Sequence, residues 1–437
     1  MEHKSPVTIF WFRRDLRLDD NAGLYHALKS GNPVLPLFIF DKDILNKLED
    51  KDDARVTFIH QTVEGLNNEL RKLGSSLLVL YDGAADAWDD VLKNYNVTAV
   101  YTNYDYEPYA KKRDEAVAQK LRKNGIEFKT FKDQVIFDHD EVIKDNGEPY
   151  TVYTPYMRKW YATLKPFYLK PYPTKKYFKN LFKVDGLTIP SLKQLGFEKS
   201  TLDIPGREYE NVIKAYADKR DFPAVNGTSH IGLHLRFGTV SIRELVATAN
   251  GYAEKTWLNE LIWREFYMMI LDHFPKTMDH AFRPEYDRIV WVNDEEQFAA
   301  WCDGQTGFPL VDAGMRELNA TGYMHNRVRM VVASFLAKDL LIDWRWGERY
   351  FARKLLDYEM ASNVGGWQWA AGSGTDAAPY FRIFNPDSQL KKFDPKLEYI
   401  KKWVPEYADF SRYPKPIIDH AFARERCLKV FKAALAK

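Results

Sequence analysis

VTIFWF, at residues 7–12, is the first of five short apolar runs in the N-terminal part of the chain. The other four are VLPLFIF at 34–40, SLLVLY at 76–81, VTAVYT at 97–102 and the weaker EFKTF at 127–131. Amphipathic stretches that suit helices lie between them, at 54–73, 84–94 and 108–124. Short apolar runs that alternate with helices are typical of a parallel sheet covered on both faces. The sequence therefore predicts a doubly wound α/β domain over residues 1–131.

The segment after the first run reads Arg13-Arg14-Asp15-Leu16-Arg17 and contains no GxGxxG, and GxxxxGK[ST] does not occur in the chain. Neither of the two common phosphate-binding loops is therefore present.

The rest of the chain changes character twice. Residues 132–205 are rich in Tyr, Lys and Pro and have poor apolar periodicity, which predicts a long connector between domains with short helical pieces. From residue 206 the helical period dominates, and we expect a nearly all-α domain over 206–437. Its expected helical segments are 208–219, 241–250, 257–273, 295–302, 326–339 and 346–360.

Cysteine content and hydropathy indicate the cellular compartment in which the protein works. The two cysteines, Cys302 and Cys427, are too few for a disulfide framework or a four-thiolate metal site. The start MEHKSPVTIFWFRRDLR lacks the apolar run of a signal peptide, and no uncharged apolar stretch reaches 18 residues. We expect a cytoplasmic protein that neither spans a membrane nor holds a metal.

Aromatic residues and charge are unevenly distributed. Nine of the 12 tryptophans lie between Trp257 and Trp403. Residues 380–437 carry thirteen Lys/Arg and seven Asp/Glu, whereas the whole chain has a net charge of only +2. The C-terminal region is therefore predicted to attract phosphates.

Two of the expected helices combine charged and aromatic residues. WLNELIWREFY at 257–267 places Glu260, Trp263 and Arg264 on one face, because they lie three and four positions apart. A surface ion pair over a packed tryptophan is the ordinary explanation of such a face. In the helix from Asn326, Asn326 and Met330 are expected to share a face while Arg329 points elsewhere, and capping and packing would explain them.

The segment 357–386 is harder to explain as core. Asp357, Glu359 and Asn363 are expected at the end of a helix, after which Gly365 and Gly366 release the chain into a tight turn. Small residues at this density let the backbone approach something bulky and flat. Core segments rarely concentrate Asn, Asp and Gly beside Trp in this way.

A fourth segment, TSHIGLHLRFGTVS at 228–241, begins with two hydroxyl residues that could hold a phosphate at a helix start. Tyr216 could cover that phosphate. An ordinary N-cap is an equally good explanation.

These segments together resemble the photolyase/cryptochrome family of flavoproteins, in particular its microbial class I cyclobutane pyrimidine dimer photolyases. The similarity is nearly end to end. It rests on FWFRRDLRLDDN at 10–21, TNYDYEP at 102–108, RDFPAVNGTS at 220–229, WLNELIWREFY at 257–267, GYMHNRVRM at 322–330 and the long stretch 344–386. The resemblance implies an antenna-binding α/β domain and a helical catalytic domain that buries a U-shaped FAD, reduced and anionic in the active form.

The resemblance also implies the reaction, which is light-dependent repair of UV-damaged DNA. An electron passes from the photoexcited reduced FAD to a flipped-out pyrimidine dimer and splits its cyclobutane ring. Glu260 is implied to hydrogen-bond the base edges, which requires a raised pKa if the carboxyl is to donate a proton. Asn363 is implied to face the flavin N5, and Arg329 to form an ion pair with Asp357 beside the flavin ring.

The remaining roles follow from the same resemblance. Residues implied to bind the cofactor are Tyr216, Thr228, Ser229, Ile231, Gly232, Trp257, Arg264, Arg329, Asp357, Glu359 and Asn363. Residues implied to contact the dimer or the DNA are Arg220, Glu260, Trp263, Asn326, Arg327, Met330, Trp369 and Arg382. Residues implied to relay electrons from the surface to the flavin are Trp367, Trp344 and Trp291.

An antenna pigment is also possible on this resemblance. Asn103 and Glu107 resemble positions that bind a folate in some members, whereas other members use a deazaflavin, a second flavin or no antenna. Two departures from the family pattern concern FAD: Gly232 stands where a Ser is common, and Glu359 stands where an Asp is common. Neither departure removes a group that the chemistry needs.

Four other functions remain open at this point. A signalling cryptochrome is disfavoured by Asn363 and by the roughly fifty residues that follow Asn385-Pro386. A (6-4) photolyase would normally show paired histidines, whereas Asn326 follows His325 here. A DASH-type enzyme that prefers single strands remains possible. An electron-transfer flavoprotein that does not bind DNA would leave Glu260 and Trp263 unexplained. We expect a monomer without an obligate protein partner.

Overall fold

The computed structural model divides into two compact units. The first, called the sheet unit, comprises Met1–Glu141, Thr163–Arg207 and Ile231–Gly251. The second, called the helical unit, comprises Val142–Ala162, Glu208–His230 and Tyr252–Lys437. The structure describes residues 5–409 and 411–436. The predicted domains 1–131 and 206–437 also include residues 1–4, 410 and 437, which lie outside the described residues. Each unit takes segments from several parts of the chain, and the domain boundaries at 131/132 and 205/206 stay predictions.

The sheet unit contains one five-stranded sheet in which every pairing is parallel. Its strands are β1 (Pro6–Phe12), β2 (Val34–Asp41), β3 (Leu78–Asp82), β4 (Asn96–Asn103) and β5 (Glu127–Phe131), in the order β3-β2-β1-β4-β5. In the register of the central strand, Trp11 lies opposite Leu37 on one side and Thr102 on the other. The predicted doubly wound α/β fold is confirmed.

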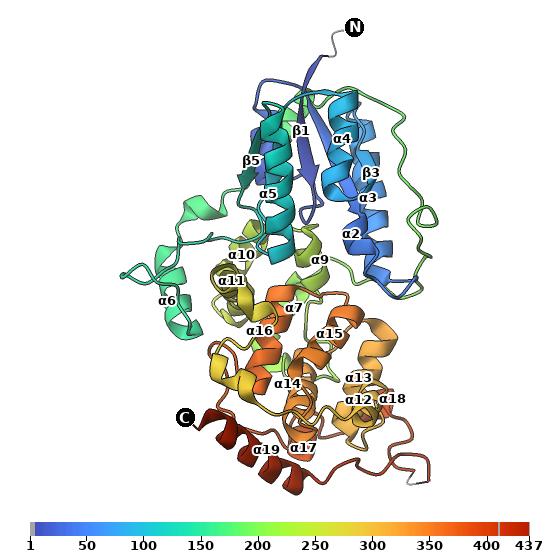
Figure 1. Ribbon diagram of the computed structural model, residues 1–437, viewed down its shortest axis with the longest axis vertical. Helices are drawn as coiled ribbons and strands as arrows, with labels where there is room; N and C mark the ends of the chain where they lie inside the picture. The colour runs from blue at the N-terminus through green and yellow to red at the C-terminus, as the bar shows by residue number, and fades with distance from the viewer. Residues whose placement is uncertain (1–4, 410, 437) are drawn as a thin grey trace. The chain divides into compact units, whose positions relative to one another are not determined.

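Helices cover both faces of this sheet, which is why its central strands β1 and β2 are almost entirely buried and apolar. Ile9 and Trp11 of β1 pack on one face in a cluster with Trp88 and Val117. These two residues belong to α4 and α5, the helices labelled beside the sheet in Figure 1. The side chain of Phe10 points to the opposite face of the sheet, where it packs in a cluster with residues of α1 and α3. The helices of this unit are α1 (Ala22–Leu28), α2 (Lys42–Leu45), α3 (Ala54–Lys72), α4 (Ala84–Asn94), α5 (Pro108–Lys123), the 3-10 helices η1 (Pro166–Leu169) and η2 (Thr174–Asn180), α9 (Gly232–Phe237) and α10 (Ile242–Gly251).

The helical unit has no strand among its described residues. Its helices are α6 (Tyr153–Thr163), α7 (Glu210–Ile213), α8 (Tyr216–Lys219), α11 (Thr256–His273), η3 (Pro275–Met278), η4 (Pro284–Arg288), α12 (Glu295–Cys302), α13 (Pro309–Thr321), α14 (Asn326–Ser334), the π-helix η5 (Phe335–Asp339), α15 (Trp344–Lys354), α16 (Met360–Ala371), α17 (Pro386–Phe393), α18 (Glu398–Trp403) and α19 (His420–Leu435). The nearly all-α prediction for this region is confirmed. Within the described part of the chain, no helix is both long enough and apolar enough to cross a membrane.

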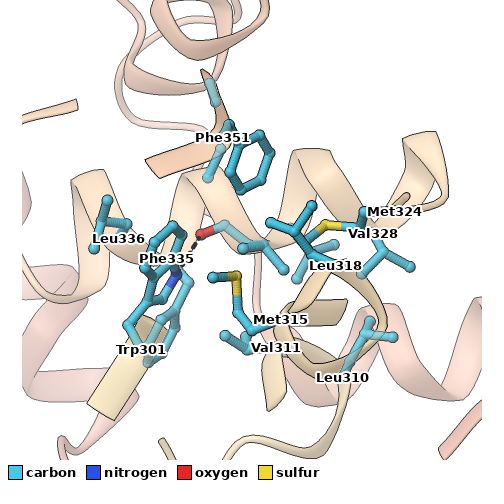
Figure 2. Packing of buried hydrophobic residues seen from close by; sticks show 14 of the residues in the cluster. Trp301, Leu310, Val311, Met315, Leu318, Met324, Val328, Phe335, Leu336 and Phe351 are labelled. Carbon is cyan, nitrogen blue, oxygen red and sulfur yellow. Dashed lines mark hydrogen bonds between the residues drawn. The ribbon is translucent and has the colours of Figure 1, made fainter. Parts of the chain in front are cut away.

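One large apolar core holds the helices around the candidate site in place. Met315, Val328 and Phe351 converge in it from α13, α14 and α15 (Figure 2). Trp301 of α12 is fully buried there, and its indole N–H donates to the carbonyl oxygen of Val332 at 3.3 Å. Burial of such side chains is worth about 1.5–3 kcal/mol each, so this core fixes the helix ends that carry the polar residues.

Two expected helices differ from the structure. The helix expected over 208–219 is split into the two short helices α7 and α8. The helix expected over 346–360 ends at Lys354, and a new helix, α16, begins at Met360 and continues to Ala371. Gly365 and Gly366 therefore lie inside a helix, and the tight turn expected there is wrong. At Gly365 a Cβ atom would lie 2.3 Å from Cδ1 of Tyr267, so the glycine allows α16 to pack closely on α11. The chain leaves α16 at Gly372 instead, with φ 87°.

Candidate active site

A cavity of about 400 Å³ lies inside the helical unit. Side chains from α11, α14, α15 and α16 and from the α15–α16 loop line it, together with Arg220 at the end of α8. Twelve of the residues selected from the sequence are among them: Arg220, Glu260, Trp263, Arg264, Asn326, Arg329, Met330, Asp357, Glu359, Asn363, Trp367 and Trp369. The fold therefore brings together segments that are separated by up to 149 residues, Arg220 and Trp369.

Glu260 and Arg220 form an ion pair in this cavity. Nη1 of Arg220 donates a hydrogen bond to Oε1 of Glu260. Burial raises the pKa of the Glu260 carboxyl, whereas the charge and the hydrogen bond of Arg220 lower it. The Glu260–Arg264 surface pair considered from the sequence does not form, because Arg264 donates to Glu359 at 3.1 Å instead.

Trp263 lies in a stack of aromatic rings. The ring of Tyr153 is nearly parallel to its indole, with centroids 3.6 Å apart and an angle of 7° between the planes. Tyr153 is itself held at both ends, because its hydroxyl donates to the carbonyl oxygen of Asn259 and its backbone N–H donates to Asp376. Tyr153 thus covers one face of Trp263, which remains half-buried at the cavity.

Arg329 also lines the cavity, so the expectation that it points away from Asn326 and Met330 is wrong. Positions 326, 329 and 330 are three and four residues apart and therefore share a face of α14. Nη2 of Arg329 donates to both carboxylate oxygens of Asp357, at 2.8 and 3.1 Å, and Nε donates to the carbonyl oxygen of Met324. The ion pair expected from the sequence is present.

Asn363 is oriented by a half-buried acid, Glu348. Its Nδ2 donates to the backbone oxygen of Glu348 at 3.1 Å and to Oε1 of the same residue at 3.0 Å. Burial raises the pKa of the Glu348 carboxyl. Because both bonds use the amide nitrogen, Asn363 keeps Oδ1 as an acceptor without a hydrogen bond to the described residues.

The three tryptophans of the expected electron relay lie in the helical unit at different depths. Trp367 is buried and lines the cavity, Trp344 is buried at the start of α15, and Trp291 is half-buried. Trp291 packs against the edge of the core and against Phe431 at 6.0 Å between ring centroids.

The residues expected around the FAD phosphates lie outside the lining of this cavity. Ser229 Oγ accepts from the indole N–H of Trp257 at 3.4 Å, and the hydroxyls of Thr228 and Tyr323 are 3.1 Å apart. Tyr216 is half-buried, and the guanidinium of Arg220 lies 5.5 Å from the centre of its ring. Ile231 and Gly232 belong to the sheet unit, at the start of α9.

Two of the expected DNA-binding residues lie outside the cavity lining. Nη2 of Arg327 donates to Asp221 at 2.6 Å. Arg382 is exposed, and its backbone oxygen accepts from Lys338.

The two antenna candidates both have partners within the sheet unit. Asn103 is buried; its Oδ1 accepts from the N–H of Gly23, and its Nδ2 donates to Asp15 and Asn21. Glu107 accepts from Arg14 and Arg236. Both amide groups of Asn103 are thus used internally, whereas the Glu107 carboxylate keeps acceptor sites, and the antenna role of the two residues stays a prediction.

Sequence reasoning did not select three residues that contact the candidate site residues from outside the cavity lining. Tyr153 and Asp221 contact residues selected from the sequence, and Glu348 orients Asn363. Tyr153 lies in the segment predicted to be a connector, which gave no sign of a contact with Trp263. Glu348 could have been found, because it lies four positions after Trp344 and three before Phe351 in α15 and therefore shares a helix face with these two buried aromatic residues.

Comparisons with known proteins point to one family. A family model described as the FAD binding domain of DNA photolyase matches residues 257–412, and a second, described as DNA photolyase, matches residues 8–176. A deoxyribodipyrimidine photo-lyase from a Synechococcus strain is 37% identical over 99% of this chain and 98% of its own length.

Solved structures agree. A bacterial class III photolyase from Agrobacterium tumefaciens superimposes with a TM-score of 0.86 at 33% identity and covers 99% of this chain and 98% of its own. An archaeal photolyase from Sulfolobus tokodaii, described as containing two FAD molecules, has a TM-score of 0.85 at 36% identity over 98% of this chain and all of its own.

Proposed function

The chain belongs to the DNA photolyase family, and from this we propose that it is a deoxyribodipyrimidine photo-lyase, which uses light to split cyclobutane pyrimidine dimers in UV-damaged DNA. One observation carries the proposal. The cavity joins a carboxyl and an indole suited to a pair of bases, Glu260 and Trp263, to the Arg329–Asp357 ion pair and the Asn363 amide, which suit a flavin.

FAD fits the residues that line this cavity. Gly366 lines it, and a Cβ atom there would meet no atom within 4 Å, so the backbone lies open to a flat ligand. Oδ1 of Asn363 can accept from an N–H group, and Arg329 can offset negative charge on a reduced ring. When bound, reduced FAD supplies the electron after it absorbs light.

The protein's own residues position the damaged bases. Trp263 and Trp369 would form apolar walls, Asn326 and Met330 would complete the pocket, and Glu260 would hydrogen-bond the base edges. Flipping a dimer out of the duplex costs a few kcal/mol, and stacking on an indole offsets about 1–3 kcal/mol per base. Walls of this kind also exclude water from the site.

Arg220, Arg327 and Arg382 would contact DNA phosphates. Arg382 is exposed. Arg220 and Arg327 both form an ion pair with Asp221, which brings them close together. Contacts of this kind give affinity that does not depend on sequence and falls steeply with salt.

Other residues complete the proposal. Trp367, Trp344 and Trp291 would relay electrons from the surface to the flavin. Tyr216, Thr228, Ser229, Ile231, Gly232 and Trp257 would bind the phosphate and ribitol parts of FAD, with Arg264 and Glu359 near the ring. The protein would act as a monomer in the cytoplasm. A second pigment, if bound, would act as an antenna.

The test uses oligothymidylate that has been irradiated with ultraviolet light. Purified protein with reduced FAD should remove the dimers under blue light and leave them intact in darkness. A flavin-loaded protein that leaves dimers intact in the light would contradict the proposal. If it also lacked salt-sensitive affinity for damaged DNA, an electron-transfer flavoprotein would be favoured.

A further inference from the structure

The Arg220–Glu260 pair joins two residues that need different partners once damaged DNA is bound. Under the proposed function, on which this inference rests, Glu260 faces the base edges and Arg220 faces a phosphate. An ionised carboxylate can only accept hydrogen bonds, whereas a protonated carboxyl can also donate to a carbonyl oxygen of a pyrimidine. The state of Glu260 that suits the free protein is therefore not the state that suits the complex.

Two of the arginines that would bind phosphates already pair with carboxylates. Asp221 lies 4.0 Å from Nε of Arg220 and accepts from Arg327 at 2.6 Å. In the free protein the two arginines are thus neutralised by Glu260 and Asp221. A DNA phosphate offers the same charge and the same kind of oxygen acceptor to a guanidinium, so it can replace a carboxylate as the partner.

The groups that face Glu260 determine what happens when Arg220 leaves. They are the charged Arg220 and Asp221 and the phenols of Tyr153, Tyr216 and Tyr267. Burial, most strongly, raises the pKa values of these three phenols, while the charge of Arg220 lowers those of Tyr153 and Tyr216. Because the net shift is upward, the phenols stay neutral at physiological pH. Among these groups Arg220 is the one that lowers the pKa of Glu260, while burial and Asp221 raise it.

We infer that Arg220 is a positioning residue that couples DNA binding to proton uptake. As dimer-containing DNA draws the guanidinium onto a phosphate, Glu260 loses its cation in a cavity that the bases have emptied of water. The carboxylate then takes one proton from solvent and donates it in a hydrogen bond to the base edge. No bond of the substrate breaks in this step, and no electron moves.

Calorimetric titration tests the coupling. The FAD-loaded protein is titrated with an oligonucleotide that carries a single thymine dimer, in buffers with different ionisation enthalpies. The variation of the apparent enthalpy with the buffer gives the number of protons bound, which should approach one. The affinity for the oligonucleotide should also depend on pH. At pH values between the pKa of Glu260 in the free protein and its higher pKa in the complex, the affinity should fall by up to tenfold for each unit by which the pH rises.

Three variants separate the outcomes. Glu260→Gln should bind the oligonucleotide without proton uptake, and Arg220→Gln should also show no uptake because its carboxyl is protonated before binding. Arg382→Gln is the matched control: it also removes a proposed phosphate contact but leaves the Arg220–Glu260 pair, so it should weaken binding and keep the uptake. Binding without uptake in the unmodified protein, or uptake that persists in Glu260→Gln, would overturn the inference alone. No preference for the dimer-containing oligonucleotide would instead overturn the proposed function as well.

Discussion

The ring of Tyr153 lies flat on the indole of Trp263, with 3.6 Å between the centroids. The two residues are separated by 110 positions in the chain, and only Trp263 lines the cavity. Because Tyr153 is tied to Asn259 and Asp376, the stack fixes the plane that Trp263 presents to a bound base. Tyr153 is therefore a positioning residue for the substrate wall.

Replacing Tyr153 tests this relationship. Tyr153→Leu should lower affinity for dimer-containing DNA by up to about tenfold, because an aromatic pair contributes about 0.5–1.5 kcal/mol. Tyr153→Phe keeps the ring and loses only the hydrogen bond to Asn259, so it should bind almost as well as the unmodified protein. Fluorescence anisotropy with damaged and undamaged duplexes measures both. Equal losses for the two duplexes would show that Tyr153 does not act through Trp263.

Trp263 and Glu260 should affect different steps. Trp263→Ala should weaken binding of damaged DNA by about 1–3 kcal/mol, since it removes a stacking surface. Glu260→Ala should mainly lower the number of dimers repaired per absorbed photon. Binding assays and repair yields at saturating DNA distinguish the two effects. If both variants lost both quantities equally, these assignments would be wrong.

Trp291 provides a test of the electron relay. Trp291→Phe should slow photoreduction of oxidised FAD, because the relay would lose its half-buried end. Repair by enzyme reduced beforehand should stay unchanged. Trp403→Phe is a suitable control, since Trp403 is also half-buried against the same core. A repair defect in the pre-reduced Trp291 variant would indicate a different role.

Gly365 and Gly366 are neighbours in α16 with opposite surroundings. Gly365→Ala should destabilise the flavin-free protein by about 1–3 kcal/mol, because its Cβ would lie 2.3 Å from the ring of Tyr267. Gly366→Ala should stabilise it by up to about 1 kcal/mol, because alanine favours the helix and its Cβ meets no atom within 4 Å. Urea unfolding measures the difference. Similar stability of the two variants would contradict the close packing of α16 on α11.

His325 makes stability depend on pH. It is buried at the start of α14, where Nδ1 accepts from the N–H of Arg327, and burial lowers its pKa to about 4. Between pH 6.5 and 4 the unfolded chain binds a proton that the folded chain does not, so the free energy of unfolding falls as the pH falls, by about 3 kcal/mol over that window.

The variant His325→Asn keeps an oxygen acceptor for the same cap and cannot titrate. Between pH 7 and pH 5 it should lose about 2 kcal/mol less unfolding free energy than the unmodified protein. Urea unfolding curves at the two pH values provide the measurement. An identical pH dependence in both proteins would mean that His325 is not the titrating group.

Several features could be predicted because they depend on local pattern. The alternation of apolar runs with amphipathic stretches predicted the parallel sheet, since a strand covered on both faces must be apolar throughout. Motif similarity selected Arg329 with Asp357, and the structure shows that pair at 2.8 Å. The prediction of a tight turn at Gly365 was wrong, because a pair of glycines can indicate either a turn or a close contact between helices. The sequence does not show which residue of another helix lies against the glycine.

The sequence by itself determined the order of the elements, the residue types available to the site and the family. Only the tertiary structure decided which side chains meet: Arg220 with Glu260, Tyr153 with Trp263, and Asn363 with Glu348. The physical reason is that periodicity reports which face of one element is apolar, whereas a contact depends on how two faces from distant parts of the chain pack together. The partner of a charged or aromatic group sets its pKa and its orientation, so the chemistry of this cavity depends on that packing.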